Sequence, residues 1–195
     1  MGLIVMIIGL VLFLGVHTLT TLRQTRAAVL TQLGGEKRYK AAYSLASAVG
    51  LALIVWGFAT YRATGWVQVW EPPASLRHTM LFLMWLAIVL VLAAYLRGYI
   101  YLLVRHPMLM GVALWALAHL MTNGDLGSIV LFGAFLAWAI FDRITLMWRN
   151  DRGAPPMPLG GFGHDALAIV AGTLVYLALA FVFHPIVIGV PVFGV

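Results

Sequence analysis

Six long apolar stretches dominate this chain and limit the structures that it can adopt. They cover residues 2–22, 41–61, 78–104, 107–122, 126–148 and 165–190. A helix of about 20 apolar residues, rising ~1.5 Å per residue, spans the ~30 Å hydrocarbon core of a bilayer. Stretches such as LFLMWLAIVLVLAAYL lack the alternation of apolar and polar residues that a membrane β-barrel needs. The sequence therefore predicts an all-α, polytopic transmembrane bundle of about six helices.

The composition agrees with this fold class and leaves little outside the bilayer. Of 195 residues, 63% are hydrophobic and 9% are charged, so a water-soluble domain of this length would expose far too much apolar surface. Residues 149–163 are rich in Pro and Gly, but the single helix expected after them could not fold alone. The first stretch lacks a basic segment before it, so we expect a retained span rather than a cleaved signal. We expect residues 1–195 to form one transmembrane domain.

The distribution of Lys and Arg predicts the orientation of the bundle. Basic residues cluster after the first, third and fifth stretches, at Arg23, Arg26, Lys37, Arg38, Lys40, Arg105, Arg143, Arg149 and Arg152. The opposite loops hold only Arg62 and Arg77. By the positive-inside rule, the basic loops face the cytoplasm and both termini lie outside. Because these basic segments are short and alternate between spans, we expect the lipid bilayer, and no nucleic acid, as their partner.

The histidines within the apolar stretches are candidates for ligands. His17 lies near the cytoplasmic end of the first stretch, His106 at the start of the fourth, and His119 about three turns further along. A single intramembrane histidine can hydrogen-bond a neighbouring helix or ligate a metal. Two imidazoles from different helices favour an iron porphyrin over a hydrated divalent cation. The chain has no cysteine, which excludes thiolate ligands.

The spacing of these histidines limits how they can pair. Thirteen residues of helix separate His106 from His119 by ~20 Å, so at most one of them can share an iron with His17. Depth alone favours His106, although Arg105, His106 and Pro107 also fit a simple helix start at the interface. The other three histidines, His78, His164 and His184, are expected at the interfaces or as helix caps.

Two further polar features need an explanation. Arg97 is expected about eight residues, or ~12 Å, inside the third helix. It either extends its side chain to the surface or faces the interior, paired with Asp142, Asp165 or a haem propionate. Asn123, Gly124 and Asp125 predict a turn between the fourth and fifth helices.

Several of these segments together resemble the NnrU family of bacterial membrane proteins. They are the early intramembrane His17, GGEKRYKAAYSLASAVGLALIVWGFA, RHPMLMGVALWALAHLMTNGD and LFGAFLAWAIFDR, and the resemblance covers nearly the whole chain. It implies a multi-pass protein of the bacterial inner membrane with periplasmic termini. The family name is associated with nitrite and nitric oxide metabolism, and the family includes the plant 15-cis-zeta-carotene isomerase, a haem b protein.

The resemblance also implies a cofactor and its ligands. His17 and His119 occupy the positions of the isomerase's two haem-ligating histidines, which implies haem b between them, with His106 as the reserve ligand. Arg97 or Arg105 would then face the propionates. The activity implied is iron-centred redox chemistry or cis–trans isomerisation of an apolar, lipid-soluble substrate. The isomerase has a cysteine three residues before its second ligand, where this chain has Ala116, so a switch to a cysteine ligand is excluded here.

Two other functions remain open from the residues alone. One is a non-enzymatic membrane scaffold, assembly factor or sensor with structural histidines. The other is a membrane methyltransferase that uses S-adenosylmethionine, because such enzymes share an RHP motif followed by a glycine, here Gly111. Those enzymes also need a glutamate near the C-terminus, and the last glutamate of this chain is Glu71.

Overall fold

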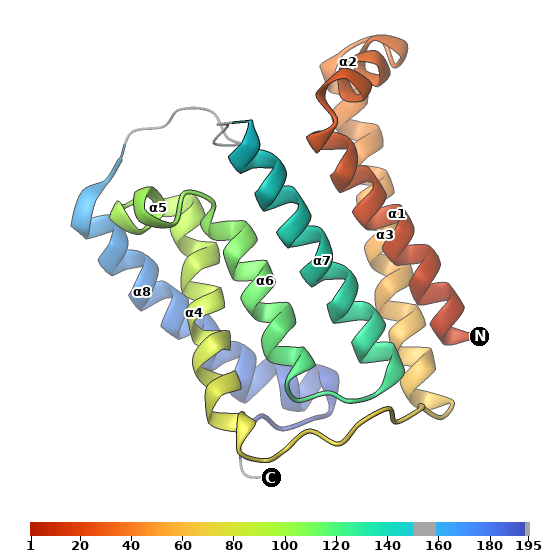
Figure 1. Cartoon of the computed structure of the whole chain (residues 1–195), viewed down its shortest axis with the longest axis vertical. Coiled ribbons are helices and arrows are strands. Elements are labelled where there is room, and N and C mark those ends of the chain that lie inside the picture. Colours follow the sequence, from red (N-terminus) through yellow and green to blue (C-terminus); the bar gives the residue numbers. More distant parts are fainter. Residues whose placement is uncertain (150–158, 194–195) are drawn as a thin grey trace.

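The computed structural model describes residues 1–149 and 159–193, and every regular element within these ranges is a helix. In chain order they are α1 (Gly2–Thr21), α2 (Arg23–Gln32), α3 (Glu36–Ala63), α4 (Leu76–Leu96), α5 (Tyr99–Val104), α6 (Pro107–Leu120), α7 (Leu126–Trp148), α8 (Gly161–Ala178) and the π-helix η1 (Leu179–Ile188). Figure 1 shows them as one elongated bundle, with α2 and α5 at one end and the α3–α4 and α6–α7 connections at the other. Arg152 and the centre of the Pro- and Gly-rich connector, residues 150–158, lie outside the described residues.

Five helical segments are long and apolar enough to cross a membrane. They are α1, α3, α4, α7 and the continuous helix formed by α8 and η1. The apolar helix α6 has only 14 residues, or ~21 Å, although it runs alongside α4 and α7 (Figure 1). The chain is therefore an all-α protein with five candidate spans, and a sixth crossing by α6 stays a prediction.

Glycines bring α1 and α3 into close contact. Gly2 and Gly9 of α1 face α3, and Gly50 and Gly57 of α3 face α1. A Cβ added to Gly57 would lie 2.3 Å from the backbone nitrogen of Met6, so the two helices would have to move apart to accept it. Small residues at such positions let the two helix backbones approach, which is a main source of helix association in a bilayer.

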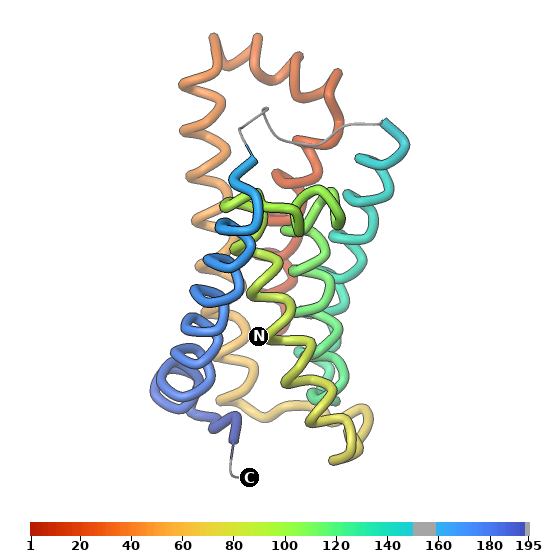
Figure 2. Tube along the Cα trace, turned by 90° about the vertical axis from the view of Figure 1, so that its left-hand side faces the viewer, coloured from red at the N-terminus to blue at the C-terminus, as the bar shows by residue number. Residues whose placement is uncertain are grey.

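The other helices assemble around α4 and α7. Helix α4 packs against α6 and α8, α6 packs against α7, and α7 packs against α1. Figure 2 shows α8 beside α4 along most of its length. The indole nitrogen of Trp85 on α4 donates a hydrogen bond of 2.9 Å to the hydroxyl of Thr173 on α8. The buried core lies where α1, α3, α6 and α7 meet, at Met6, Leu10, Ile54, Ala116, Leu131 and Phe132.

The connection between α3 and α4, residues 64–75, crosses the end of the bundle and binds the α6–α7 turn. The backbone nitrogens of Val69 and Trp70 donate to the carbonyl oxygen of Gly124, at 2.9 and 3.1 Å. The backbone nitrogen of Leu126 donates a hydrogen bond of 2.8 Å to the carbonyl oxygen of Val67. The turn lies where the sequence predicts it, between α6 and α7. The structure adds that the Asp125 side chain accepts from the backbone nitrogen of Ser128 and caps α7.

Candidate functional site

His119 lies near the C-terminal end of α6, surrounded by rings from three elements. Its imidazole stacks on Phe132 of α7, with ring centroids 4.3 Å apart and an interplanar angle of 22°. The ring centroid of Trp115, one turn earlier on α6, lies 5.3 Å from that of His119. His184 of η1 completes the group, with its ring centroid 6.4 Å from that of His119 and an interplanar angle of 30°. His119 is therefore held in a mainly aromatic environment with a second imidazole beside it.

The backbone fixes the tautomer of His119. Its Nδ1 lies 2.8 Å from the carbonyl oxygen of Trp115. A carbonyl oxygen can only accept, so Nδ1 must carry the proton and donate. In a neutral imidazole the lone pair then lies on Nε2. Metal-binding histidines are commonly held in this way, with one ring nitrogen bonded to a carbonyl and the other free for the metal.

His17 has the same local geometry at another place in the bundle. Its Nδ1 lies 2.6 Å from the carbonyl oxygen of Phe13, so its Nε2 is also the unprotonated nitrogen of the neutral ring. The ring stacks on Phe13 at 4.2 Å and approaches Tyr43 of α3 and Trp138 of α7 at 5.3 and 5.8 Å. His17 therefore lies where α1, α3 and α7 meet.

The structure places His17 and His119 at different levels of α7. His17 contacts Trp138, whereas His119 contacts Phe132, and six residues of helix separate these two rings by about 9 Å. Ring contacts of 5.4–5.8 Å from Phe13 to Phe135 and from Phe135 to Trp115 run between the two histidines. In this arrangement His119 adjoins His184, and the pairing of His17 with His119 on one iron stays a prediction.

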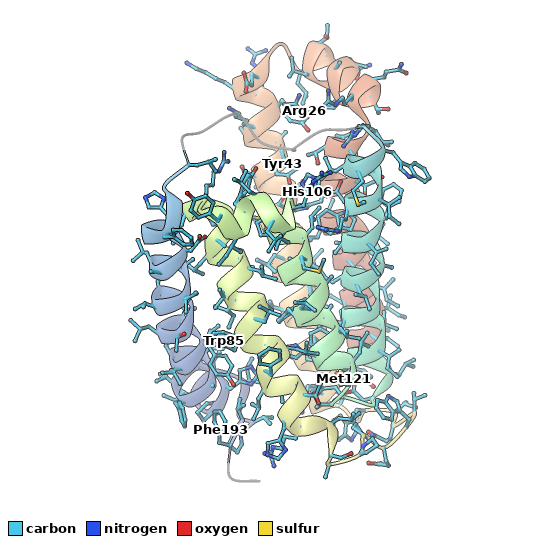
Figure 3. The ribbon with its side chains drawn as sticks, turned by 60° about the vertical axis from the view of Figure 1, so that its left-hand side comes forward. Arg26, Tyr43, Trp85, His106, Met121 and Phe193 are labelled. Atoms are coloured by element: carbon cyan, nitrogen blue, oxygen red, sulfur yellow. The ribbon has the colours of Figure 1, made fainter. Side chains whose placement is uncertain are left out.

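His106 occupies the opposite end of α6, as the sequence predicts. It is the residue before Pro107, the first residue of the helix, and it is buried. Figure 3 shows His106 toward the same end as Tyr43 and Arg26, whereas Met121, two residues after His119, lies toward the end that holds Phe193. Burial, then the positive charges of Arg143 and Arg105, lower the pKa of His106 below its ordinary value. His106 is therefore neutral at physiological pH.

This lowered pKa predicts a pH-dependent stability. The unfolded chain takes up a proton at His106 near pH 6.5, whereas the folded protein resists it, so the stabilisation is complete above that pH and is lost as the pH falls below it. We expect acidification from pH 7.5 to 5 to lower the melting temperature of the wild type by roughly 1–3 °C more than that of His106→Gln. Thermal unfolding in detergent measures this difference. The exposed His78→Gln variant is the control, and equal pH profiles for His106→Gln and the wild type would contradict the prediction.

Arg97 does not lie inside a helix, so the prediction of a continuous helix through this position is wrong. Helix α4 ends at Leu96, and Arg97 follows it in the left-handed conformation, with φ 54° and ψ 54°. Its side chain is buried, and the guanidinium lies 5.2 Å from the ring centre of Tyr101. Arg97 therefore packs at the basic end of the bundle, between α4 and α5.

Asp165 explains why the predicted helix over residues 78–104 breaks at this point. Its two carboxylate oxygens accept from the backbone nitrogens of Tyr99 and Ile100, at 2.8 and 3.0 Å. These donors open the short helix α5, where they have no partner within the helix. Only a glycine fits at position 98, because a Cβ there would lie 2.0 Å from Asp165 Oδ1. Asp165 of α8 thus anchors the break between α4 and α5.

Arg105 ends α5 and marks a second irregular point of the backbone. Its φ is 63°, a region that non-glycine residues rarely adopt, and its side chain is exposed. Arg143 of α7 supports the same bend, because both terminal guanidinium nitrogens donate to the carbonyl oxygen of Val104 at 3.3 Å. Arg97, Arg105 and His106 therefore gather at the α5 end, whereas His119 lies near the other end of α6.

His184 is the site residue that the sequence reasoning missed. We expected it near the outer face only as an interfacial residue or a cap, and the structure adds that it is half-buried beside His119. The depth of the two residues along their helices could have indicated the contact, since each lies near the same end of a predicted span. The π-helical winding of η1, which sets the direction of the His184 side chain, could not be read from the sequence.

Comparison with known proteins identifies the family. No curated protein and no solved structure matches the chain. The family described as NnrU protein matches residues 5–192, which is almost the full length. With its apolar helices and its histidines within the bundle, the chain belongs to the NnrU family.

Proposed function

We propose that this protein is a multi-pass haem b protein of the bacterial inner membrane, with His119 as one ligand of the iron. The observation that carries the proposal is the 2.8 Å hydrogen bond from His119 Nδ1 to the Trp115 carbonyl oxygen, which leaves Nε2 ready to coordinate. Membership of the NnrU family and five candidate spans support a place in the membrane. The basic α2 and α5 end would face the cytoplasm.

The surroundings of His119 fit a porphyrin better than a bare metal ion. A porphyrin supplies four ligands of its iron, so one or two imidazoles complete the coordination. Hydrated Mg²⁺ and Ca²⁺ take oxygen ligands, whereas the ring neighbours of His119 are Trp115, Phe132 and His184. The flat apolar rings of Trp115 and Phe132 would also exclude water from the macrocycle.

The residues around His119 limit the chemistry that a haem bound there could carry out. When bound, haem supplies one-electron exchange at its iron, which suits a redox role linked to nitrite or nitric oxide, or isomerisation of an apolar, lipid-soluble substrate. Ala116, one turn before His119, is fully buried and offers no ligand atom. His119 would therefore keep its place on the iron without competition from that position.

The position of His119 restricts the role of the two arginines. Arg97 and Arg105 flank α5, and about 20 Å of helix separates the start of α6 from His119. They could pair with propionates only if the iron lay at the level of His17. For a haem on His119, we propose no propionate contact with either arginine.

Absorption spectra of the purified protein test the haem proposal. We expect a Soret band in the oxidised protein and sharpened visible bands after reduction, both lost in His119→Gly. Free imidazole added to His119→Gly should restore the bands by occupying the vacated space, which a merely structural role of His119 would not produce. The exposed His78→Gly is the matched control and should keep the wild-type spectrum. A wild-type protein without a Soret band, after expression with sufficient haem, would refute the proposal.

A further inference from the structure

Positive charge gathers at the start of α6. Arg105 lies two residues before the helix, and Arg143 of α7 donates from both terminal nitrogens to the carbonyl oxygen of Val104, at 3.3 Å. Both positive charges act on the imidazole of His106. Within residues 1–149 and 159–193, neither of these arginines forms an ion pair, and the first turn of α6 has no acidic residue.

Two carboxylates at this end of the bundle are occupied by other groups. Asp142 of α7 interacts electrostatically with Arg149 and His17. Both oxygens of Asp165 accept hydrogen bonds from the backbone nitrogens that open α5. The described part of the chain therefore does not neutralise the positive charge around His106.

Unused hydrogen-bond donors lie beside this charge. The side chain of His106 is only 8% exposed, yet it does not cap α6 and forms no hydrogen bond with any described residue. Pro107 has no N–H, and the backbone nitrogens of Met108 and Leu109 have no acceptor in the described chain. A buried polar group without a partner is costly, and free amides at a helix start attract anions. The site therefore favours an anion with several acceptor oxygens, such as a phosphate group.

The neighbouring surface favours a phosphate that is attached to a lipid. Helix α5 lies across the bundle, and α7 continues beyond it in both views (Figures 1 and 2). Leu102 and Leu103 of α5, just before Arg105, are 38% and 86% exposed. The site thus lies below the end of a candidate span, with cationic groups beside exposed apolar side chains. A phospholipid combines a phosphate with acyl chains that can cover such leucines, whereas a free anion in water cannot cover them.

We propose that Arg105, Arg143 and His106 bind the phosphate group of an anionic phospholipid at the start of α6. The phosphate oxygens accept hydrogen bonds from the guanidinium groups and from one imidazole N–H, and the acyl chains lie against the exposed leucines of α5. Bonds of this kind between cationic donors and phosphate are among the stronger hydrogen bonds of proteins. About 20 Å of helix separates this site from His119, so the proposal does not depend on haem.

Thermal unfolding in detergent with added lipid tests the site. Dioleoylphosphatidylglycerol at about ten times its dissociation constant should raise the melting temperature of the wild type by roughly 3–6 °C. The shift should fall to roughly half or less in Arg105→Gln and vanish when Arg143→Gln is added, because each change removes cationic donors. Arg38→Gln is the matched control, since it removes an exposed arginine from the same end of the bundle and should keep the full shift.

The other outcomes would overturn the proposal. Equal losses of the shift in Arg38→Gln and Arg105→Gln would show that the lipid binds the basic surface as a whole. Inorganic phosphate should produce no shift, and an equal shift with the same losses would identify free phosphate as the ligand and refute the lipid. If the double variant fails to fold, Arg105→Gln decides alone, because its exposed side chain forms no hydrogen bond with the described residues.

Discussion

Gly57→Ala is expected to destabilise the protein by about 1–3 kcal/mol, although alanine favours helices more than glycine does. The added Cβ would lie 2.3 Å from the backbone nitrogen of Met6, 2.7 Å from its Cα and 2.9 Å from the carbonyl oxygen of Gly2. All three are backbone atoms, so no side-chain rotation can relieve the overlap and α1 must move away from α3. Thermal unfolding in detergent, followed by tryptophan fluorescence, should show a melting temperature lower by about 2–12 °C.

Gly15→Ala is the matched control for this prediction. Gly15 lies on α1, is exposed, and has no atom within 4 Å of an added Cβ. Its replacement should leave stability unchanged or raise it by up to about 1 kcal/mol through helix propensity. If the two variants melt at the same temperature, close packing of α1 against α3 is not what holds this helix pair together.

Asp165→Ala is expected to cost about 2–4 kcal/mol and to loosen the basic end of the bundle. The substitution leaves the backbone nitrogens of Tyr99 and Ile100 without their acceptor, and bonds to a charged partner contribute about 1.5–3 kcal/mol each. Hydrogen exchange should rise at residues 97–104, and the melting temperature should fall. Glu71→Ala, which removes an exposed carboxylate, should change neither. Unchanged exchange at residues 97–104 in Asp165→Ala would show that the carboxylate does not hold α5.

The fold class follows from features that act over short distances. Hydropathy locates the apolar helices, because in a bilayer the backbone must satisfy its own hydrogen bonds and an apolar segment becomes a helix. Pro107 starts α6 because proline lacks the donor that a first helical residue does not need. The turn between α6 and α7 falls at Asn123, Gly124 and Asp125, which are residue types that favour turns. These predictions needed only adjacent residues.

The break at Arg97 depends on distant residues and could not be predicted in this way. The apolar pattern continues through residues 78–104, so local propensity favours one helix. The interruption forms because Asp165, 66 residues after Tyr99, supplies acceptors for the new helix start. Gly98 is the local sign of this arrangement, but a single glycine in an apolar segment also occurs in unbroken helices.

The candidate site was predictable only in part for the same reason. Sequence spacing separates His106 from His119 along one helix, and the structure keeps them at opposite ends of α6. The neighbours of each histidine depend on how the helices pack. The contact of His119 with His184 joins α6 to η1, and the contact of His17 with Trp138 joins α1 to α7. Neither contact can be recognised from the residues that are adjacent to one histidine in the sequence.

The seam between α1 and α7 also sets an order of assembly. Helices α1 and α3 are neighbours in the chain and pack against each other, so they can pair as soon as both have entered the membrane. Trp138 follows His17 by roughly 120 residues, and at about 5–20 residues per second the ribosome reaches it some 6–24 seconds later. Until then, His17 has Tyr43 of α3 beside it but lacks its contact with Trp138 of α7. The insertion of α7 thus completes the ring contacts of His17 and joins the first helix pair to the rest of the protein.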